Sequence, residues 1–311
     1  MLAKLRNLPR RQKHYLIFMA AITVAAFLIR LVIAYDLKHH YPPVTRPVEI
    51  ADNYTYMVLA RQILEGTFDY AKGFYYQPFY YAVFLPLLWW LTGPGIDSVI
   101  WCQSLLGAIT CLLVGLMAAR MAGRRAGILA GILCVLDRYL IFYTPVTLIA
   151  SVQAFLFTFT AYLAQRAQLT RKYPLVLWAG TGFVLGLSNL TRGNMILLVP
   201  VILPFVFLKN FPLKQKLVQA VAFIIFFFLP QAPFTIINYH ATGRWIGPST
   251  AGPAVIALGN TPQSPPGELL YPETCNRWIA MHKAPPPEHV SLYRNVWNWI
   301  KTEPLAWGEL K

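Results

Sequence analysis

The sequence predicts an all-α protein, a polytopic transmembrane helical bundle of about seven spans. Hydrophobic residues make up 57% of the 311 residues and charged residues 13%, against roughly 45–50% and about 25% in soluble domains. Several apolar runs approach the ~20 residues that a helix needs to cross a bilayer. A soluble globular domain is therefore excluded.

The expected spans are seven apolar runs at residues 15–35, 98–119, 126–142, 152–164, 175–190, 195–208 and 217–239. The first is expected to be retained, because no small-residue cleavage site follows it. Arg30 lies about one turn from its far end, from where the side chain is expected to reach the membrane surface. The aromatic run 77–91 is short for a span, so we expect it to lie on the outer surface or to re-enter. Residues 1–239 then form a transmembrane module with an outer loop at 36–77, and residues 240–311 form an outer polar segment.

The distribution of charge predicts the orientation of the bundle. The net charge is +15, and fourteen Lys and Arg residues but no acidic residue lie in four segments: 1–14, 120–125, 165–173 and 209–216. Basic residues in short loops mark the cytoplasmic side of membrane proteins. This orientation places the loop 36–77 and the C-terminal segment outside. It also explains the positive charge without a nucleic-acid partner.

The outer loop carries the main candidate for catalysis. From Asp52 the apolar residues follow a helical period as far as Gly66, which predicts a short surface helix. Asp52 could act as a general base on an acceptor hydroxyl. The alternative is that Asp52 merely caps the helix that it begins. Glu49, one turn earlier, is either a second carboxylate of the site or a solvated charge.

Two cations are candidates for phosphate binding. Arg192 lies in a polar break between two apolar runs, where a guanidinium could hold a phosphate through two parallel hydrogen bonds. The alternative is a tight turn whose arginine reaches lipid headgroups. Lys72, beside Gly73, is a weaker candidate or a solvated residue. Asp137 and Arg138 are expected to form an ion pair inside the bundle.

The sequence indicates neither a metal site nor a cofactor. The four cysteines show no CxxC spacing, and the two adjacent histidines, His39 and His40, lack the spacing of metal ligands. Motifs for nucleotide binding or soluble hydrolase chemistry are absent from the sequence. We therefore expect no bound cofactor.

Several stretches resemble the GT-C superfamily of polyprenyl-phosphate-sugar-dependent glycosyltransferases. The resemblance is nearest to the dolichyl-phosphate-mannose-protein mannosyltransferase-like branch, which includes the bacterial aminoarabinose transferases. The stretches are Asp52-Asn53-Tyr54-Thr55-Tyr56 in the first outer loop, Tyr76-Gln77-Pro78-Phe79-Tyr80 at the entry to an apolar segment, Thr191-Arg192 at a helix end, and Gly259-Asn260 in the outer tail.

The resemblance implies a membrane enzyme that moves a sugar from a polyprenyl-phosphate carrier to an acceptor hydroxyl at the outer face, with inversion. It implies Asp52 as the catalytic base, and Arg192, Lys72, Tyr56, Tyr76 and Glu49 as substrate-binding candidates. The acceptor could be a glycolipid, a polysaccharide or a protein. The compact loops favour a bacterial plasma membrane.

Two alternatives to this enzyme stay open at the level of sequence. One is a transporter or flippase of lipid-linked sugars, although such proteins carry charged or helix-breaking residues at the bilayer midplane. The other is an inactive, truncated homologue, since relatives continue into further helices.

Overall fold

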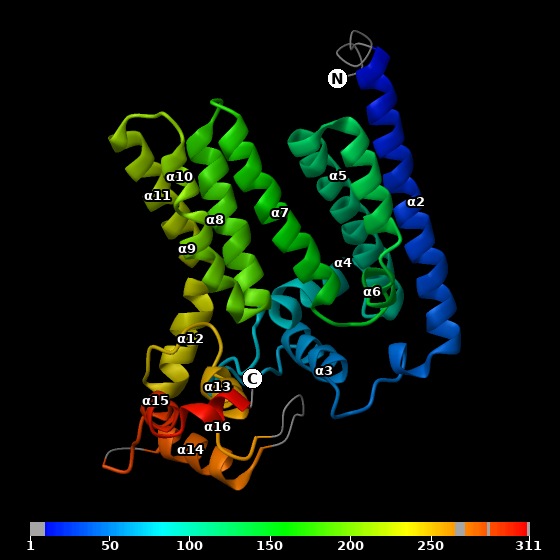
Figure 1. The fold of residues 1–311 in the computed structure, drawn as a ribbon. Helices are drawn as coiled ribbons and strands as arrows, with labels where there is room; N and C mark the ends of the chain where they lie inside the picture. Colours follow the sequence, from blue (N-terminus) through cyan, green and yellow to red (C-terminus); the bar gives the residue numbers. More distant parts are fainter. Residues whose placement is uncertain (1–9, 265–270, 285–286, 310–311) are drawn as a thin grey trace. The chain divides into compact units, whose positions relative to one another are not determined.

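The computed structural model describes residues 10–264, 271–284 and 287–309, and these are helical with no strand among them (Figure 1). This confirms the all-α class. The chain divides into two compact units. The first contains Met1–Tyr70 and Gln77–Pro233, and the second contains Ala71–Tyr76 and Phe234–Lys311.

The helices follow one another through both units with short connections. In the first unit they are α2 Arg10–His40, η1 Pro42–Val44, α3 Asp52–Leu64, the π-helix η3 Phe79–Phe84, α4 Leu85–Thr92, α5 Ile96–Val135, α6 Arg138–Phe142, α7 Ala150–Leu169, α8 Pro174–Thr191, η4 Gly193–Leu198, α9 Val199–Ile202, α10 Phe205–Leu208, α11 Leu213–Phe228 and η5 Leu229–Gln231. The short η2 Tyr70–Lys72 and α12 Ala232–Thr242 cross into the second unit, which continues with α13 Gly252–Gly259, α14 Glu273–Lys283, α15 Leu292–Thr302 and α16 Pro304–Glu309.

Within the described residues, four helical stretches are long and apolar enough to cross a membrane: Gln12–His40, Ile96–Val135, Pro174–Thr191 and Leu213–Thr242. Two shorter apolar stretches are Phe79–Thr92 and Gly193–Leu208. The protein is therefore a helical membrane bundle, and the number of seven spans stays a prediction.

Helix α5 consists of two arms. The backbone leaves the helical region at Ala122 and at Gly123, whose φ of 87° is accessible mainly to glycine. The arms before and after this break pack closely, because a Cβ atom on Gly127 would lie 2.7 Å from the carbonyl oxygen of Gly115. Small residues let the two backbones approach, as is common between membrane helices. The two apolar runs expected at 98–119 and 126–142 are these arms.

The second arm ends earlier than expected, at Val135 instead of residue 142. Asp137 is exposed and caps α6, with its Oδ1 atom accepting a hydrogen bond from the amide of Leu140 at 3.0 Å. Arg138 is also exposed and donates to the hydroxyl of Tyr139. The expected ion pair inside the bundle is therefore wrong. A short acidic side chain satisfies a free amide at a helix start instead.

Arg30 was expected to reach the membrane surface, and this is wrong as well. Helix α2 continues to His40, so Arg30 lies ten residues before its end and is fully buried. Its guanidinium donates to the carbonyl groups of Ala26 at 3.2 Å and Cys134 at 3.4 Å. Gly107 leaves room for the Arg30 side chain, since a Cβ atom on residue 107 would lie 2.5 Å from Nε of Arg30.

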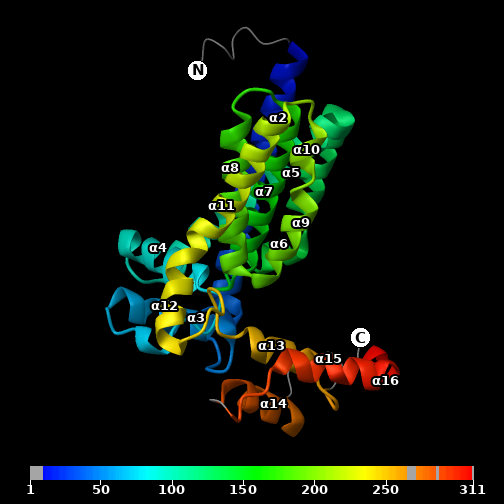
Figure 2. The ribbon, with the colours of Figure 1, turned by 90° about the vertical axis from the view of Figure 1, so that its left-hand side faces the viewer.

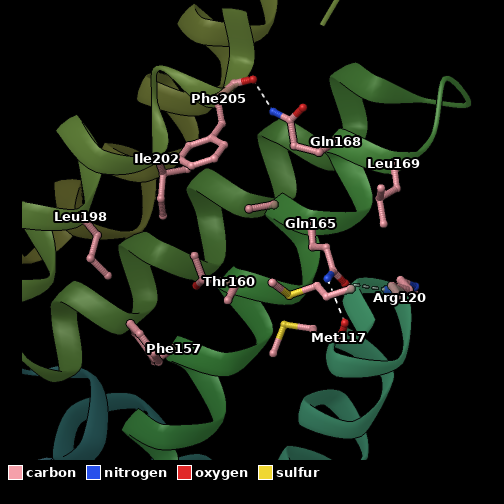
Figure 3. Close-up of a pocket in the computed structure, with 13 residues that line it drawn as sticks. Met117, Arg120, Phe157, Thr160, Gln165, Gln168, Leu169, Leu198, Ile202 and Phe205 are labelled. Carbon is pink, nitrogen blue, oxygen red and sulfur yellow. Dashed lines mark hydrogen bonds between the residues drawn. The ribbon is translucent and has the colours of Figure 1, made fainter. Parts of the chain in front are cut away.

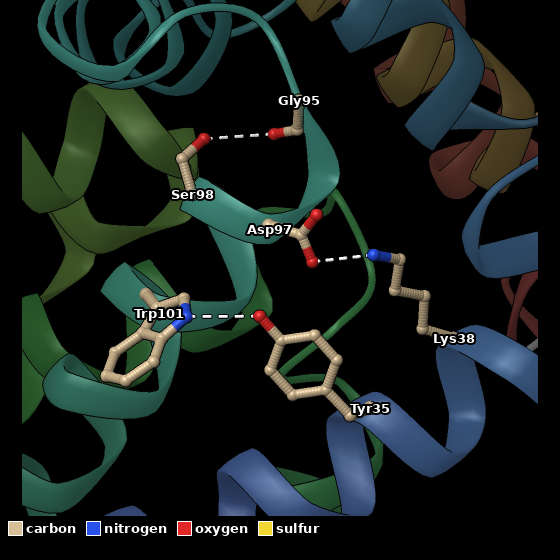
Figure 4. Close-up of polar contacts among 6 residues, drawn as sticks. All are labelled: Tyr35, Lys38, Gly95, Asp97, Ser98 and Trp101. Carbon is tan, nitrogen blue, oxygen red and sulfur yellow. Dashed lines mark hydrogen bonds and ion pairs between the residues drawn. The ribbon is translucent and has the colours of Figure 1, made fainter.

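The basic segments gather at one end of the first unit. The break in α5, the α7–α8 connection and the α10–α11 connection lie at the same end as the start of α2 (Figure 1). At the opposite end, Lys38 of α2 pairs with Asp97 of α5 at 2.6 Å, and Trp101 donates to the hydroxyl of Tyr35 at 3.1 Å (Figure 4). These contacts fix the end of α2 against the start of α5.

Helix α7 lies between α5 and α8 (Figures 1 and 2). Helix α8 packs in turn on α11, and their contact contains the buried residues Trp178, Leu185, Phe223 and Phe227. Gly182 and Gly186 bring these two helices together, as the hypothetical Cβ atoms would lie 2.1 Å and 2.3 Å from backbone carbonyl oxygens of α11. The position of the C-terminal end of α8 is thereby fixed.

Candidate functional site

Asp52 is the first residue of α3 and is exposed. The capping position belongs to Ala51, which has an extended backbone, and the helix start has no side-chain capping hydrogen bond. The expectation that Asp52 caps the helix is therefore wrong, because the helix begins at this residue instead of after it. The carboxylate still lies in the first turn, where the helix dipole favours a negative charge by about 0.3–1 kcal/mol. Glu49 lies exposed in the turn before it.

The next turn of α3 is held by aromatic packing. Tyr56 is 7% exposed, and its ring stacks on Tyr81 at a centroid distance of 6.0 Å and meets the edge of Tyr80 at 5.6 Å. On the same buried side, Asn53 donates to the carbonyl oxygen of Pro43 at 3.2 Å. One face of α3 is thus fixed on η3, and Asp52 lies on the exposed side. The structure places Tyr56 in this packing contact, and its role in substrate binding stays a prediction.

Arg192 lies next to Gly193, which contacts the segment just before η3. Arg192 is exposed and follows the last residue of α8, with its amide donating to the carbonyl of Ser188 at 2.9 Å. Gly193 faces Gln77, which precedes η3, since a Cβ atom on Gly193 would lie 2.6 Å from Nε2 of Gln77. Within the residues that the structure describes, no hydrogen bond or ion pair involves the guanidinium group of Arg192.

Hydrogen bonds of a buried amide stabilise the turn that contains Arg192. The buried Asn189 donates to Oε1 of Gln231 at 2.8 Å and accepts a hydrogen bond from the amide of Ile196 at 2.9 Å. Gln231 itself donates to the carbonyl of Phe227. Buried amide groups with paired hydrogen bonds hold a unique geometry. We infer that this bracing fixes the exit of the chain from α8.

Two further side-chain amides, the buried Gln103 and the half-buried Gln153, were assigned no role from the sequence. Gln103 donates to the carbonyl groups of Thr144 at 2.8 Å and Val146 at 3.0 Å, and it accepts from Tyr80 at 3.4 Å. Gln153 donates to the hydroxyl of Ser188 at 3.0 Å. The signal for both was an amide inside an otherwise apolar run, since polar groups within a membrane bundle usually face its interior.

The contacts link Asp52 and Arg192 along one path. Asp52 is one turn from Tyr56, Tyr56 packs on Tyr80 and Tyr81, and η3 begins two residues after Gln77, which faces the glycine beside Arg192. All these residues belong to the first unit. The contacts therefore connect the helix start that carries Asp52 with the helix end that precedes Arg192. The start of α3 and the end of α8 both lie at the end of the bundle opposite to the basic segments (Figure 1).

Lys72 and Tyr76 belong to the second unit. The amide of Phe74 donates to Oδ1 of Asn238 at 2.6 Å, and Thr250 donates to the carbonyl of Phe74 at 2.9 Å, so the segment Ala71–Tyr76 is part of that unit's fold. The ring of Tyr76 meets the edge of Tyr75 at 4.9 Å. Burial raises the pKa of Tyr75, and the neighbouring Tyr271 and Tyr76 phenols add to this shift. Lys72 is exposed.

The described part of the chain contains no group of three or more His, Cys, Asp and Glu side chains placed to share a metal ion. The polar groups of the candidate site are the carboxylate of Asp52, the guanidinium of Arg192 and side-chain amides. Such groups can accept a proton, bind a phosphate and hydrogen-bond sugar hydroxyls.

A comparison with protein families bears on this arrangement. The profile of the family described as dolichyl-phosphate-mannose-protein mannosyltransferase matches residues 76–234, just over half of the chain. This chain belongs to that family. It is thus a membrane glycosyltransferase of the GT-C type. No curated protein and no solved structure matches the chain.

The family match covers only part of the candidate site. Residues 76–234 include Tyr76, η3, the amides of Gln103 and Gln153, and Arg192. Glu49, Asp52, Tyr56 and Lys72 lie before it. The match therefore supports the class of the enzyme, while the roles of these individual residues rest on their geometry and on the sequence motifs.

Proposed function

We propose that this glycosyltransferase moves a sugar from a polyprenyl phosphate to an acceptor hydroxyl at the outer face of a membrane, with inversion and with Asp52 as general base. The observation that carries the proposal is the exposed carboxylate of Asp52, which no side-chain capping bond occupies and which opens a helix fixed on η3. A base must be free to meet the proton that it takes.

The reaction is a single displacement at the anomeric carbon. The acceptor oxygen forms a bond to this carbon, while the bond from the carbon to the phosphate oxygen breaks and polyprenyl phosphate leaves with the electron pair. The acceptor proton passes to the carboxylate of Asp52. Attack from the side opposite to the leaving group inverts the configuration.

Arg192 is proposed to bind the phosphate of the donor. Negative charge develops on the phosphate as the bond breaks, and a guanidinium at this position stabilises it. The braced turn after α8 supports this role, because a positioned cation loses little freedom when the phosphate binds. Four further residues stay candidates for contacts with the sugar, the acceptor or the polyprenyl phosphate: Glu49, Tyr56, Tyr76 and Lys72.

The proposed location is the outer, periplasmic face of a bacterial plasma membrane. Fourteen basic residues lie in the segments predicted to face the cytoplasm, and Asp52 and Arg192 belong to the opposite end of the first unit (Figure 1). The acceptor is a glycolipid, a polysaccharide or a protein. No cofactor is required by this mechanism.

The test compares wild type with Asp52→Asn in membranes supplied with polyprenyl-phosphate sugars and an extract of envelope acceptors. Release of polyprenyl phosphate is measured, together with binding of the donor. Loss of a general base lowers turnover by about 10²–10⁴-fold, and donor binding is expected to be retained.

Glu65→Gln is the matched control, because Glu65 is an exposed carboxylate at the other end of the same helix. Its turnover should equal that of wild type. Equal turnover in Asp52→Asn and Glu65→Gln would remove Asp52 from the mechanism.

A further inference from the structure

A groove of about 590 Å³ lies at the end of the first unit that carries the basic segments (Figure 3). Helix α7 forms its floor, with α5 on one side and η4, α9 and α10 on the other. Most of the lining side chains are apolar, among them Phe157 and Ala161, and the polar ones are Arg120, Thr160, Gln165 and Gln168. A volume of this size is typical of sites for small ligands.

The shape of the groove fits a lipid tail. Met121, Phe157 and Leu169 are exposed, so the groove is open along its side. Gln168 lies eleven residues after Phe157 on α7, so the floor is roughly 16 Å long at about 1.5 Å per residue. This is about half of the ~30 Å hydrocarbon core of a bilayer. The groove is therefore as long as the hydrocarbon of one leaflet.

Arg120 is held at the charged end of the groove. Its guanidinium donates to Oε1 of Gln165 at 3.3 Å and to the hydroxyl of Tyr162 at 3.2 Å, and it lies 4.7 Å from the centre of the Tyr162 ring. Gln165 is fixed in turn by its bond to the carbonyl of Met117 at 3.1 Å. A guanidinium has five N–H donors, so this orientation leaves donors that can bind a phosphate.

The surroundings of Arg120 add to the positive charge. Arg124 and Arg125 follow on α5 and Arg166 follows Gln165 on α7, all three exposed. The segments 120–125 and 165–173 contain no acidic residue. Basic clusters between membrane helices on the cytoplasmic side bind anionic lipid headgroups.

We propose that this groove binds an anionic glycerophospholipid of the inner leaflet, with an acyl chain along α7 and the headgroup phosphate on Arg120. The choice of a glycerophospholipid over the polyprenyl donor rests on the proposed function. A carrier with its phosphate on Arg120 would lie at the end of the bundle opposite to Asp52 and Arg192, on the wrong side of the membrane for transfer.

The test counts lipids retained by the purified full chain in detergent, using native mass spectrometry. Phosphatidylglycerol and phosphatidylcholine with identical acyl chains are added in turn. Wild type is expected to retain one phosphatidylglycerol with about tenfold preference, the size of effect expected from one hydrogen-bonded charge. Arg120→Gln should lose this preference, and Ala161→Trp, which fills the groove, should lose retention of both lipids.

Arg125→Gln is the matched control, because Arg125 belongs to the same basic segment but does not line the groove. It should retain the preference. An equal loss in Arg120→Gln and Arg125→Gln would overturn the proposal in favour of diffuse attraction. Displacement of phosphatidylglycerol by equimolar polyprenyl phosphate would overturn it in favour of the carrier. The readout is lipid retention, so it does not depend on transferase turnover.

Discussion

Replacement of Gly186 by alanine tests how closely α8 packs on α11, at the end of α8 that precedes Arg192. A Cβ atom at Gly186 would lie 2.3 Å from the carbonyl oxygen of Phe227 and 2.8 Å from Cγ of Pro230. The first distance is about 1.1 Å shorter than the 3.4 Å at which ordinary contact begins. The obstructing atom belongs to the helix backbone, so α8 and α11 must separate to relieve the overlap.

The expected cost follows from this separation. Overpacking of a close-packed core costs about 1–3 kcal/mol, and a gap of 0.5–1 Å already removes roughly a quarter to a half of the dispersion energy of the separated contacts. Separation also strains the bond between Asn189 and Gln231, which is worth about 1 kcal/mol. We expect a loss of about 2–3 kcal/mol from packing, partly offset by the ~1 kcal/mol by which alanine favours a helix over glycine.

Gly180→Ala on the same helix is the matched control. A Cβ atom there meets only Cδ1 of Leu163 at 3.8 Å, an ordinary contact. It gains the same helix propensity without the overlap. The free energy of unfolding, measured by SDS titration of the purified protein with circular dichroism, should therefore be about 2–3 kcal/mol lower in Gly186→Ala than in Gly180→Ala. Equal stability of the two variants would refute the close packing of α8 on α11 at Gly186.

Three further predictions concern other parts of the chain. Burial lowers the pKa of His282, and the nearby His289 and Arg244 add to this shift. The contribution of neutral His282 to stability is therefore complete above about pH 6.5 and is lost as the pH falls through the lowered pKa. Because the His282 ring accepts a hydrogen bond from the amide of Leu292, hydrogen exchange in α15, corrected for the intrinsic rate, should speed up on acidification, and a constant rate would contradict this. Lys38→Ala, which removes the half-buried partner of the exposed Asp97, should lower stability by no more than about 1 kcal/mol, and a larger loss in an SDS titration would show that the pair acts as more than a surface contact. Tyr56→Ala should make α3 accessible to proteolysis while Tyr56→Phe, which keeps the ring stacking on Tyr81, should not; equal cleavage of both variants would contradict the role of the ring.

Much of the fold was predictable from the sequence. Apolar composition predicted a helical bundle, and the arginines at 120–125 correctly marked the break that divides α5. Helix ends were less predictable, since α2 continues five residues beyond Tyr35 and the second arm of α5 stops at Val135. Hydropathy detects where a helix can lie in lipid, while its end depends on local capping such as that by Asp137.

Contacts made over long separations could not be predicted. Arg30 is buried because Gly107 on another helix leaves space for it, and a single sequence does not show which glycine faces which arginine. The same holds for the amide pair of Asn189 and Gln231. The residue types at the site could be named in advance, but the way in which η3 connects the two sides of the site could not.

The second unit combines two segments that are far apart in the sequence, and this affects the order in which the protein can fold during synthesis. Phe74 pairs with Asn238, a residue that leaves the ribosome 164 positions later. At the usual rate of about 5–20 residues per second, synthesis of the intervening chain takes roughly 10–30 s. During this interval the segment Ala71–Tyr76 has been translated without its partners, with the free backbone groups of Phe74 and Tyr75 open to water, to other chains or to a chaperone. Completion of the second unit must therefore follow translation of α12, however early the first helices insert.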